Sequence, residues 1–195
     1  MTAEPPHTTS WPMPPLDGYT VDDLFSLPDL PPHTELIDGS LVFVSPQRSF
    51  HALVIEVLVF GLRKTVPGDR RVRREMNVVI NERQAPEPDL FVIRAEAVIG
   101  PEESRYEVKD VELVVEVVSP ESAVRDRKRK PQLYAEAGIR HFWRVEHGED
   151  GYPVVHVFEL DEATSTYGLT GIHHNQLKLS VPFTIDIDLT EIDHL

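Results

Sequence analysis

The sequence predicts a mixed α/β (α+β) fold whose C-terminal half is rich in strands. Residues 88–93 and 111–118 are continuous apolar runs, as expected for strands that are buried on both faces. Residues 51–64 form a longer segment with apolar side chains at three- and four-residue steps, which favours a helix. With 195 residues, the chain is long enough for one domain with a sizeable core.

The N-terminal part is predicted to hold an arm and a short helix. We expect residues 1–16 to be a flexible arm, because they contain many prolines and few apolar side chains. Residues 17–195 are expected to form a single domain. Thr20 followed by Asp23 is typical of a helix N-terminus, and the prolines that come next keep this helix short.

Strands are predicted on both sides of the long helix. Residues 35–44 have the pattern of a β-hairpin with Asp-Gly at its turn, and residues 71–80 alternate enough to form one strand. Short apolar runs separated by polar turns fill the C-terminal half. The strands predicted there are residues 141–145, 154–160, 167–170, 176–179 and 183–187.

A second helical stretch is predicted over residues 121–137, with Gly138 as its C-terminal stop. Pro131 lies inside this stretch. Proline lacks an amide donor and biases the preceding residue, Lys130, away from helical geometry. We therefore expect a kink, or a helix that properly begins at Pro131.

Composition excludes several classes of protein. The net charge of −14 argues against a general nucleic-acid coat protein, which should carry a basic face. No apolar run is long enough to cross a bilayer, and the first residues lack the pattern of a secretory signal. The absence of cysteine excludes disulfides and thiolate metal sites. A cytoplasmic location without membrane contact is expected.

Two basic islands interrupt this acidic chain and could contact nucleic acid. The first lies within residues 63–74 and the second within residues 125–130. Each could equally be the solvated face of a strand or helix. The candidate nucleic-acid contacts are Arg70, Arg71, Arg73, Arg74, Arg125, Arg127 and Lys128.

Two acidic residues lie where the sequence predicts buried strands. Asp89 opens one apolar run, and Glu116 interrupts the other. A carboxylate in such a strand is costly unless it is paired, hydrogen-bonded or bound to a cation. If the strands are neighbours, both carboxylates can meet at one sheet edge and bind Mg²⁺ or Mn²⁺. The alternatives are a turn or cap role for Asp89 and a buried salt bridge for Glu116, for example with an arginine of the first basic island.

Asp126, Lys130 and Tyr134 follow at a spacing of four residues, which would place them on one face of a continuous helix. Lys130 is the functional candidate, because an ammonium group near a metal site can stabilise negative charge that develops on a phosphate. The alternative is an ordinary ion pair with an aromatic ring packed below it.

Glu35 and His51 are additional candidates. Glu35 precedes the predicted hairpin, and His51 opens the long helix, where an imidazole could orient water or contact phosphate. The alternatives are a salt bridge within the hairpin for Glu35 and a polar helix-start residue for His51.

In their order along the chain, these motifs resemble the Uma-type putative restriction endonuclease family of bacteria, within the PD-(D/E)xK nuclease superfamily. The resemblance covers about residues 17–190. The residues that carry it are Glu35-Leu-Ile-Asp-Gly39, His51, Pro88-Asp89-Leu90, Glu116-Val-Val-Ser119-Pro120, Asp126, Lys130, Tyr134, Gly138-Ile139 and Phe142-Trp143.

The resemblance implies a restriction-endonuclease-like fold, with a mixed central sheet flanked by helices. It implies that Asp89 and Glu116 are metal ligands and that the backbone carbonyl of Val117 completes the set. The chain departs from the superfamily at one point, because the lysine expected two residues after the acid is Val118 here. The resemblance places that lysine at Lys130, in the following helix.

Motifs and resemblance together predict a Mg²⁺- or Mn²⁺-dependent endonuclease that hydrolyses phosphodiester bonds of nucleic acid, with DNA as the expected substrate. Catalysis is assigned to Asp89, Glu116 and Lys130, with Glu35 and His51 in support. A homodimer is expected. Two alternatives stay open: a catalytically idle homodimer that binds nucleic acid or a protein, and a structural or regulatory homodimer.

Overall fold

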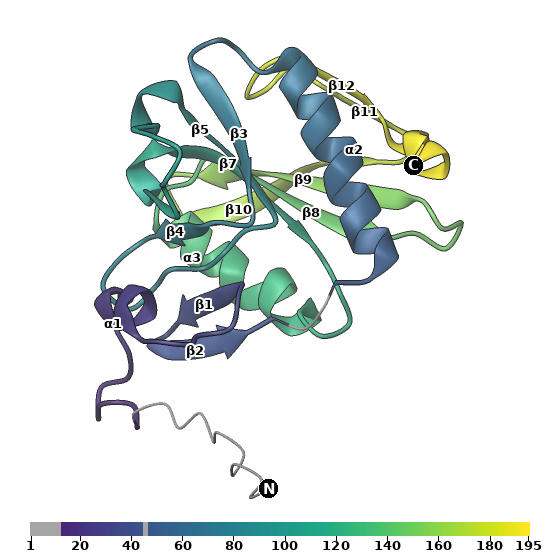
Figure 1. The fold of residues 1–195 in the computed structure, drawn as a ribbon. Helices are drawn as coiled ribbons and strands as arrows, with labels where there is room; N and C mark the ends of the chain where they lie inside the picture. Colours follow the sequence, from purple (N-terminus) through teal and green to yellow (C-terminus); the bar gives the residue numbers. More distant parts are fainter. Residues whose placement is uncertain (1–12, 45–46) are drawn as a thin grey trace, which may run out of the picture.

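A six-stranded mixed sheet forms the centre of the molecule, in the strand order β10-β9-β8-β7-β5-β3 (Figure 1). The computed structural model describes residues 13–44 and 47–195, so the larger part of the arm predicted over residues 1–16 lies outside the described residues. Neighbouring strands are antiparallel except β7 and β8, which are parallel. The strands are β3 (Arg70–Arg74), β5 (Leu90–Arg94), β7 (Val111–Val117), β8 (His141–His147), β9 (Pro153–Asp161) and β10 (Thr166–His173).

Helices cover both faces of this sheet. The long helix α2 (Ser49–Thr65) packs on one face, and α3 (Lys130–Glu136) belongs to the hydrophobic cluster on the other (Figure 1). Strand β5 shows the alternation: Leu90 and Val92 belong to the cluster on the α2 side, whereas Phe91 and Ile93 belong to the opposite one. The mixed central sheet flanked by helices is thus confirmed, as is the burial of its central strands on both faces.

The parallel step from β7 to β8 requires a crossover, and the helical stretch around Pro131 supplies it. This stretch begins as a π-helix over Arg125–Arg129 and continues as α3. The Lys130 amide donates to the carbonyl of Arg125, five residues back, and Pro131 donates nothing. The predicted irregularity before Pro131 is therefore present as a π-turn, and the helix proper begins at Lys130. Gly138, at φ +80°, follows the helix as expected.

The N-terminal helix and hairpin form as predicted. Helix α1 (Val21–Ser26) begins with a capping box in which Thr20 and Asp23 satisfy each other's backbone amides. The hairpin joins β1 (Thr34–Ile37) to β2 (Ser40–Phe43). Asp38 and Gly39 at its turn have φ values of 52° and 70°, the positive pair that a tight hairpin turn requires.

The prediction of one continuous strand over residues 71–80 is wrong. Strand β3 ends at Arg74, and Glu75 adopts a left-handed conformation with φ 51°. The chain then turns away into β4 (Asn77–Val79), which pairs in parallel with β6 (Arg105–Glu107) in a separate two-stranded sheet. The Glu75 amide donates to the carbonyls of Pro88 and Asp89, at 3.2 and 3.3 Å, so this break holds Glu75 against the start of β5.

The C-terminal hairpin packs on α2. It joins β11 (Gln176–Leu179) to β12 (Ile185–Asp188), and Leu177, Ile185 and Ile187 belong to the core on the α2 side. Gly61 of α2 permits the approach, because a Cβ there would lie 2.5 Å from Ile187. Short 3₁₀ turns occupy Ala95–Ala97, Val108–Asp110 and Leu189–His194. In the part of the chain that the structure describes, no helix is long and apolar enough to span a membrane.

Candidate active site

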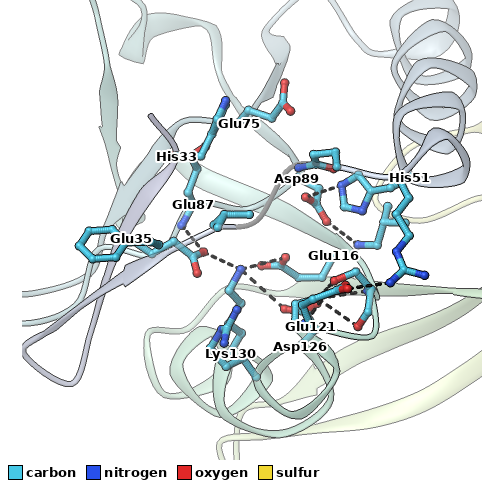
Figure 2. A pocket seen from close by; sticks show the side chains of 18 residues that line it. His33, Glu35, His51, Glu75, Glu87, Asp89, Glu116, Glu121, Asp126 and Lys130 are labelled. Carbon is cyan, nitrogen blue, oxygen red and sulfur yellow. Dashed lines mark hydrogen bonds and ion pairs between the residues drawn. The ribbon is translucent and has the colours of Figure 1, made fainter. Parts of the chain in front are cut away.

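All five side chains predicted to act in catalysis line one small cavity, which lies where β5 begins and β7 ends (Figure 2). Its volume of about 160 Å³ leaves room for a hydrated ion. Asp89 comes from the start of β5, Glu116 from β7 and Glu35 from β1. His51 lies in the first turn of α2, and Lys130 opens α3.

Strand pairing brings Asp89 and Glu116 to adjacent positions. Strands β5 and β7 are antiparallel, and Leu90 pairs with Val115. Continuing this register by one position sets Asp89 across from Glu116, which is the proximity that the sequence predicted for neighbouring strands. The Asp89 carboxylate accepts a hydrogen bond from the Val117 amide at 2.6 Å and is joined to His51 Nε2 at 3.0 Å. Asp89 therefore bridges two elements.

Glu116 is held from the side of α3. Its side chain is 1% exposed, Oε1 accepts a hydrogen bond from the Tyr134 hydroxyl at 2.5 Å, and Oε2 accepts one from Lys130 Nζ at 3.1 Å. Burial raises the pKa of Glu116 well above its usual range, against the opposing charge of Lys130. Glu116 does form a buried salt bridge, but its partner is Lys130 and not an arginine of the first basic island.

Lys130 lies among three carboxylates. Its Nζ is 2.6 Å from Glu35, 3.1 Å from Glu116 and 3.7 Å from Asp126, and its side chain is 6% exposed. Burial alone would lower the pKa of Lys130, but these carboxylates raise it well above its ordinary value. The ammonium group therefore stays charged, and it is outnumbered by the acids around it.

Glu35 contacts Lys130 rather than a residue of its own hairpin. Its Oε1 forms an ion pair with Lys130 Nζ at 2.6 Å and accepts a hydrogen bond from the Glu87 amide at 2.9 Å. His51 contacts Asp89: burial lowers the pKa of this imidazole, but the hydrogen bond and charge of Asp89 raise it above the usual value. Glu35 and His51 therefore each contact a charged group of the cavity, Lys130 in the first case and Asp89 in the second.

Asp126 is a cavity residue that the sequence placed in a motif with Lys130 and Tyr134 but to which it assigned no role of its own. It is 2% exposed, and its Oδ1 accepts no hydrogen bond from any residue that the structure describes. Burial raises its pKa to about 6, although the charge of Lys130 and a hydrogen bond from the Ser122 side chain oppose that shift. The sequence feature that could have identified it is its four-residue spacing from Lys130, but this spacing is the same for a buried ion pair and for an exposed one. Glu75 and Glu87 also line the cavity, and no sequence signal placed them there.

The basic islands are divided by the fold. The four candidate arginines of the first island lie on β3, an edge strand, and none of them lines the cavity. Of the second island, Arg125 lines the cavity, whereas the exposed Arg127 forms an ion pair with Glu146. Lys128 is exposed and lies beside Arg127 in a neighbouring groove. The Arg125 guanidinium has no hydrogen-bond or ion-pair partner among residues 13–44 and 47–195.

The donor set suits a hard divalent cation. Carboxylate oxygens line the cavity in excess over cationic groups, and Mg²⁺ needs only one or two carboxylates because it keeps several waters. Within the described ranges, no group of three or more acidic or histidine side chains is placed so that it could hold one ion. The residues thus fit a Mg²⁺-type site in chemistry and charge, with a ligand set that ion binding must complete.

Comparison with known proteins supplies independent findings. Residues 21–190 match the model of the family Uma2, described as "Putative restriction endonuclease". A crystal structure of a protein from Anabaena variabilis, described as a putative nuclease belonging to DUF820, is similar with a TM-score of 0.68 and 15% sequence identity. The similarity covers 89% of this chain and 96% of that one, and it concerns the fold. None of the curated proteins compared with the chain matches it.

Proposed function

This chain belongs to the Uma2 family, described as "Putative restriction endonuclease", and we propose that it is a divalent-metal-dependent endonuclease acting on nucleic acid. One observation supports this proposal above the others. Four carboxylates, from Glu35, Asp89, Glu116 and Asp126, line a single cavity that holds one lysine. Such an excess of buried negative charge is stable only with a cation or with bound protons.

We assign the metal site to Asp89, Glu116 and the backbone carbonyl of Val117. These groups lie where β5 and β7 meet and offer only oxygen, the ligand that Mg²⁺ and Mn²⁺ prefer. When bound, the ion would supply a nucleophile at neutral pH and neutralise charge on the attacked phosphate. The chain's own part is to position the acids: His51 and the Val117 amide orient Asp89, and Tyr134 orients Glu116.

Lys130 supplies a fixed positive charge beside these ligands. Its stem is buried, and Glu35 anchors its ammonium from the side opposite Glu116 (Figure 2). A preoriented charge in a buried site stabilises negative charge on a phosphorane more strongly than the same charge in water. Lys130 therefore acts electrostatically on the phosphate, and Glu35 keeps its ammonium in place.

The position of Arg125 favours a substrate that carries phosphate. It lines the cavity, and the described residues offer its guanidinium no anion. An arginine without a partner beside a cation site suits bidentate recognition of a phosphate group. The remaining contacts with nucleic acid, for which DNA is the foremost candidate, would involve β3 and the exposed Arg127 and Lys128.

A catalytically idle homodimer that binds nucleic acid or a protein is the second candidate function. It is favoured by the fact that both carboxylates assigned to the metal already have partners within the chain. Asp89 has two partners, and Glu116 has two. In an idle protein these contacts would be the final state, and in the nuclease an ion would compete with them.

A cleavage assay separates the two candidates. Supercoiled, linear and single-stranded DNA and an RNA would be incubated with Mg²⁺, with Mn²⁺ and with chelator. We expect cleavage that needs the ion and is abolished in Asp89→Ala. Asp69→Ala is the matched control, because Asp69 lies on the surface with a side chain 72% exposed, and the change in net charge is the same. Equal cleavage by both variants, or none by the wild type, would contradict the proposal.

A further inference from the structure

Of the buried carboxylates around the cavity, Asp126 differs in its hydrogen bonding. Both oxygens of Asp89 and both of Glu116 have partners, and Oε1 of Glu35 has two. Asp126 Oδ1 accepts no hydrogen bond from the described part of the chain, although the side chain is 2% exposed. Buried polar atoms in folded proteins are nearly always satisfied, and an exception requires an explanation.

Pairing with Lys130 does not explain Asp126. The ammonium is already within 2.6 Å of Glu35 and 3.1 Å of Glu116, whereas its 3.7 Å contact with Asp126 is too long for a hydrogen bond. A third carboxylate exceeds what one ammonium group can neutralise. The surplus negative charge lies at the side of the cavity that also holds the two acids assigned to the metal.

The backbone around Asp126 is unusual at the same point. Asp126 lies in the π-helical turn Arg125–Arg129, where the chain departs from α-helical hydrogen bonding just before Lys130. Single π-turns are rare and frequently occur at functional sites. Arg125 and Asp126 of this turn and Lys130, which follows it, line one cavity, and Figure 2 shows the last two side by side.

We propose that Asp126 is a third carboxylate of the cation site, whose Oδ1 holds the ion through one of its bound waters. This inference rests on the proposed metal-dependent function, and it adds a residue that lies outside the pair Asp89 and Glu116. It also accounts for the missing hydrogen bond, because that water would occupy the place of the absent donor.

Calorimetric titration of the metal-free full-length protein with Mn²⁺ tests the proposal without an activity assay. Asp126→Asn should weaken the affinity for Mn²⁺ by roughly 10- to 100-fold, the range seen when groups that support a metal site are removed. Glu121→Gln is the matched control. Glu121 also lines the cavity, but its side chain is 46% exposed and forms an ion pair with Arg48 at 2.7 Å. Its replacement should change the affinity less than about threefold, because exposed charges are screened by solvent and salt.

The outcomes are distinct. A loss of affinity in Asp126→Asn that Glu121→Gln does not share supports the inference. Equal affinities of Asp126→Asn and the wild type, or equal losses in the two variants, overturn it while leaving the proposed function intact. Absence of Mn²⁺ binding by the wild type overturns both. Circular dichroism reports folding, and if Asp126→Asn fails to fold, Asp126→Ser is titrated in its place and judged by the same outcomes.

Discussion

The cavity and the β3 edge contain similar side chains in opposite physical situations. Around the cavity, Glu35, Glu116, Asp126 and Lys130 are almost fully buried. Along β3, Arg71 and Arg74 are exposed, and Arg70 and Arg73 are half-buried. The edge arginines find local partners: Arg70 pairs with Asp69 and Glu112, and Arg74 with Glu75. The cavity acids share one lysine.

This difference shows where charge can carry out chemistry. An exposed ion pair contributes only about 0–1 kcal/mol because water solvates each partner nearly as well. A buried pair cannot be broken without leaving a charge that nothing solvates, at a cost of about 3–5 kcal/mol. The protein retains three acids in the second situation, Glu35, Glu116 and Asp126, which is why the cavity rather than the edge is the functional candidate. The predictions below compare a buried residue with an exposed counterpart.

Removing Lys130 should have the largest effect. Lys130→Met leaves three buried carboxylates without their shared cation, so the free energy of unfolding should fall by about 3–5 kcal/mol. Arg71→Met on the β3 edge should change it by less than about 0.5 kcal/mol, because Arg71 is exposed and donates only to backbone carbonyls. Urea unfolding at neutral pH measures both. Similar small losses in the two variants would show that the cavity charges are solvated.

The same lysine should matter for turnover, provided that cleavage is observed. Lys130→Ala should lower turnover by an amount equivalent to roughly 2–4 kcal/mol of transition-state stabilisation, with Mn²⁺ binding largely retained. Lys178→Ala is the counterpart, because Lys178 is 68% exposed on β11 and lies outside both the cavity and the basic islands. Single-turnover rates at a temperature where both variants are folded provide the comparison. Unchanged turnover in Lys130→Ala would remove Lys130 from the mechanism.

Stability should decrease with pH because of Asp126. Burial raises the pKa of this carboxyl from its ordinary value of 3.8 to about 6, so the folded chain holds a proton that the unfolded chain releases. The contribution is therefore present below pH 4 and is lost as pH rises through 6, by roughly 3 kcal/mol. Denaturant unfolding from pH 4 to 7 should show this decrease. Asp126→Asn should lessen the decrease by about this amount, whereas the part that comes from the raised pKa of Glu116 remains, and Asp69→Asn at the exposed edge should retain the full decrease.

Two tyrosines offer a smaller contrast of the same kind. The fully buried Tyr134 donates to Glu116 at 2.5 Å, whereas the exposed hydroxyl of Tyr152 donates to Asp193 at 2.5 Å. Tyr134→Phe leaves a buried carboxylate oxygen without its donor and should lower the free energy of unfolding by about 1–3 kcal/mol. Tyr152→Phe should cost less than about 0.5 kcal/mol, because water replaces the lost partner. Thermal unfolding of both variants would expose any reversal of this order.

The sequence predicted the two strands that carry the site better than it predicted the site's surroundings. Continuous apolar runs are enough to locate β5 and β7, and an acid beside or within such a run is visible by inspection. The end of β3 was not predictable, because it depends on the left-handed conformation of Glu75, which is stabilised by carbonyls from the start of β5. A local pattern contains no information on that distant contact.

Asp126 illustrates the limit for the site itself. Its spacing from Lys130 fits a solvent-exposed ion pair as well as a buried one, and only tertiary packing decides between them. The free oxygen depends on the hydrogen bonds of every neighbouring group, and no pattern of residues within one segment specifies that. Glu75 and Glu87 also line the cavity because of tertiary packing, which no local pattern of residues specifies.

Nucleic-acid binding provides the last and smallest contrast, since the acidic surface should repel a phosphate backbone except at the basic islands. Charge reversal at Arg71 and Arg73 should weaken binding to all sequences alike, because phosphate contacts carry no base information. Each lost phosphate contact should reduce the slope of log affinity against log salt on duplex DNA by about 0.9, so the double variant should lose less than two units. Arg125→Ala should reduce the slope of log affinity against log salt by about one unit, because it removes the free guanidinium of the cavity. Fluorescence anisotropy in chelator, where cleavage cannot occur, measures these slopes. If no nucleic acid binds even at low salt, neither the cavity nor the β3 edge contacts phosphate, and the protein-binding alternative takes precedence.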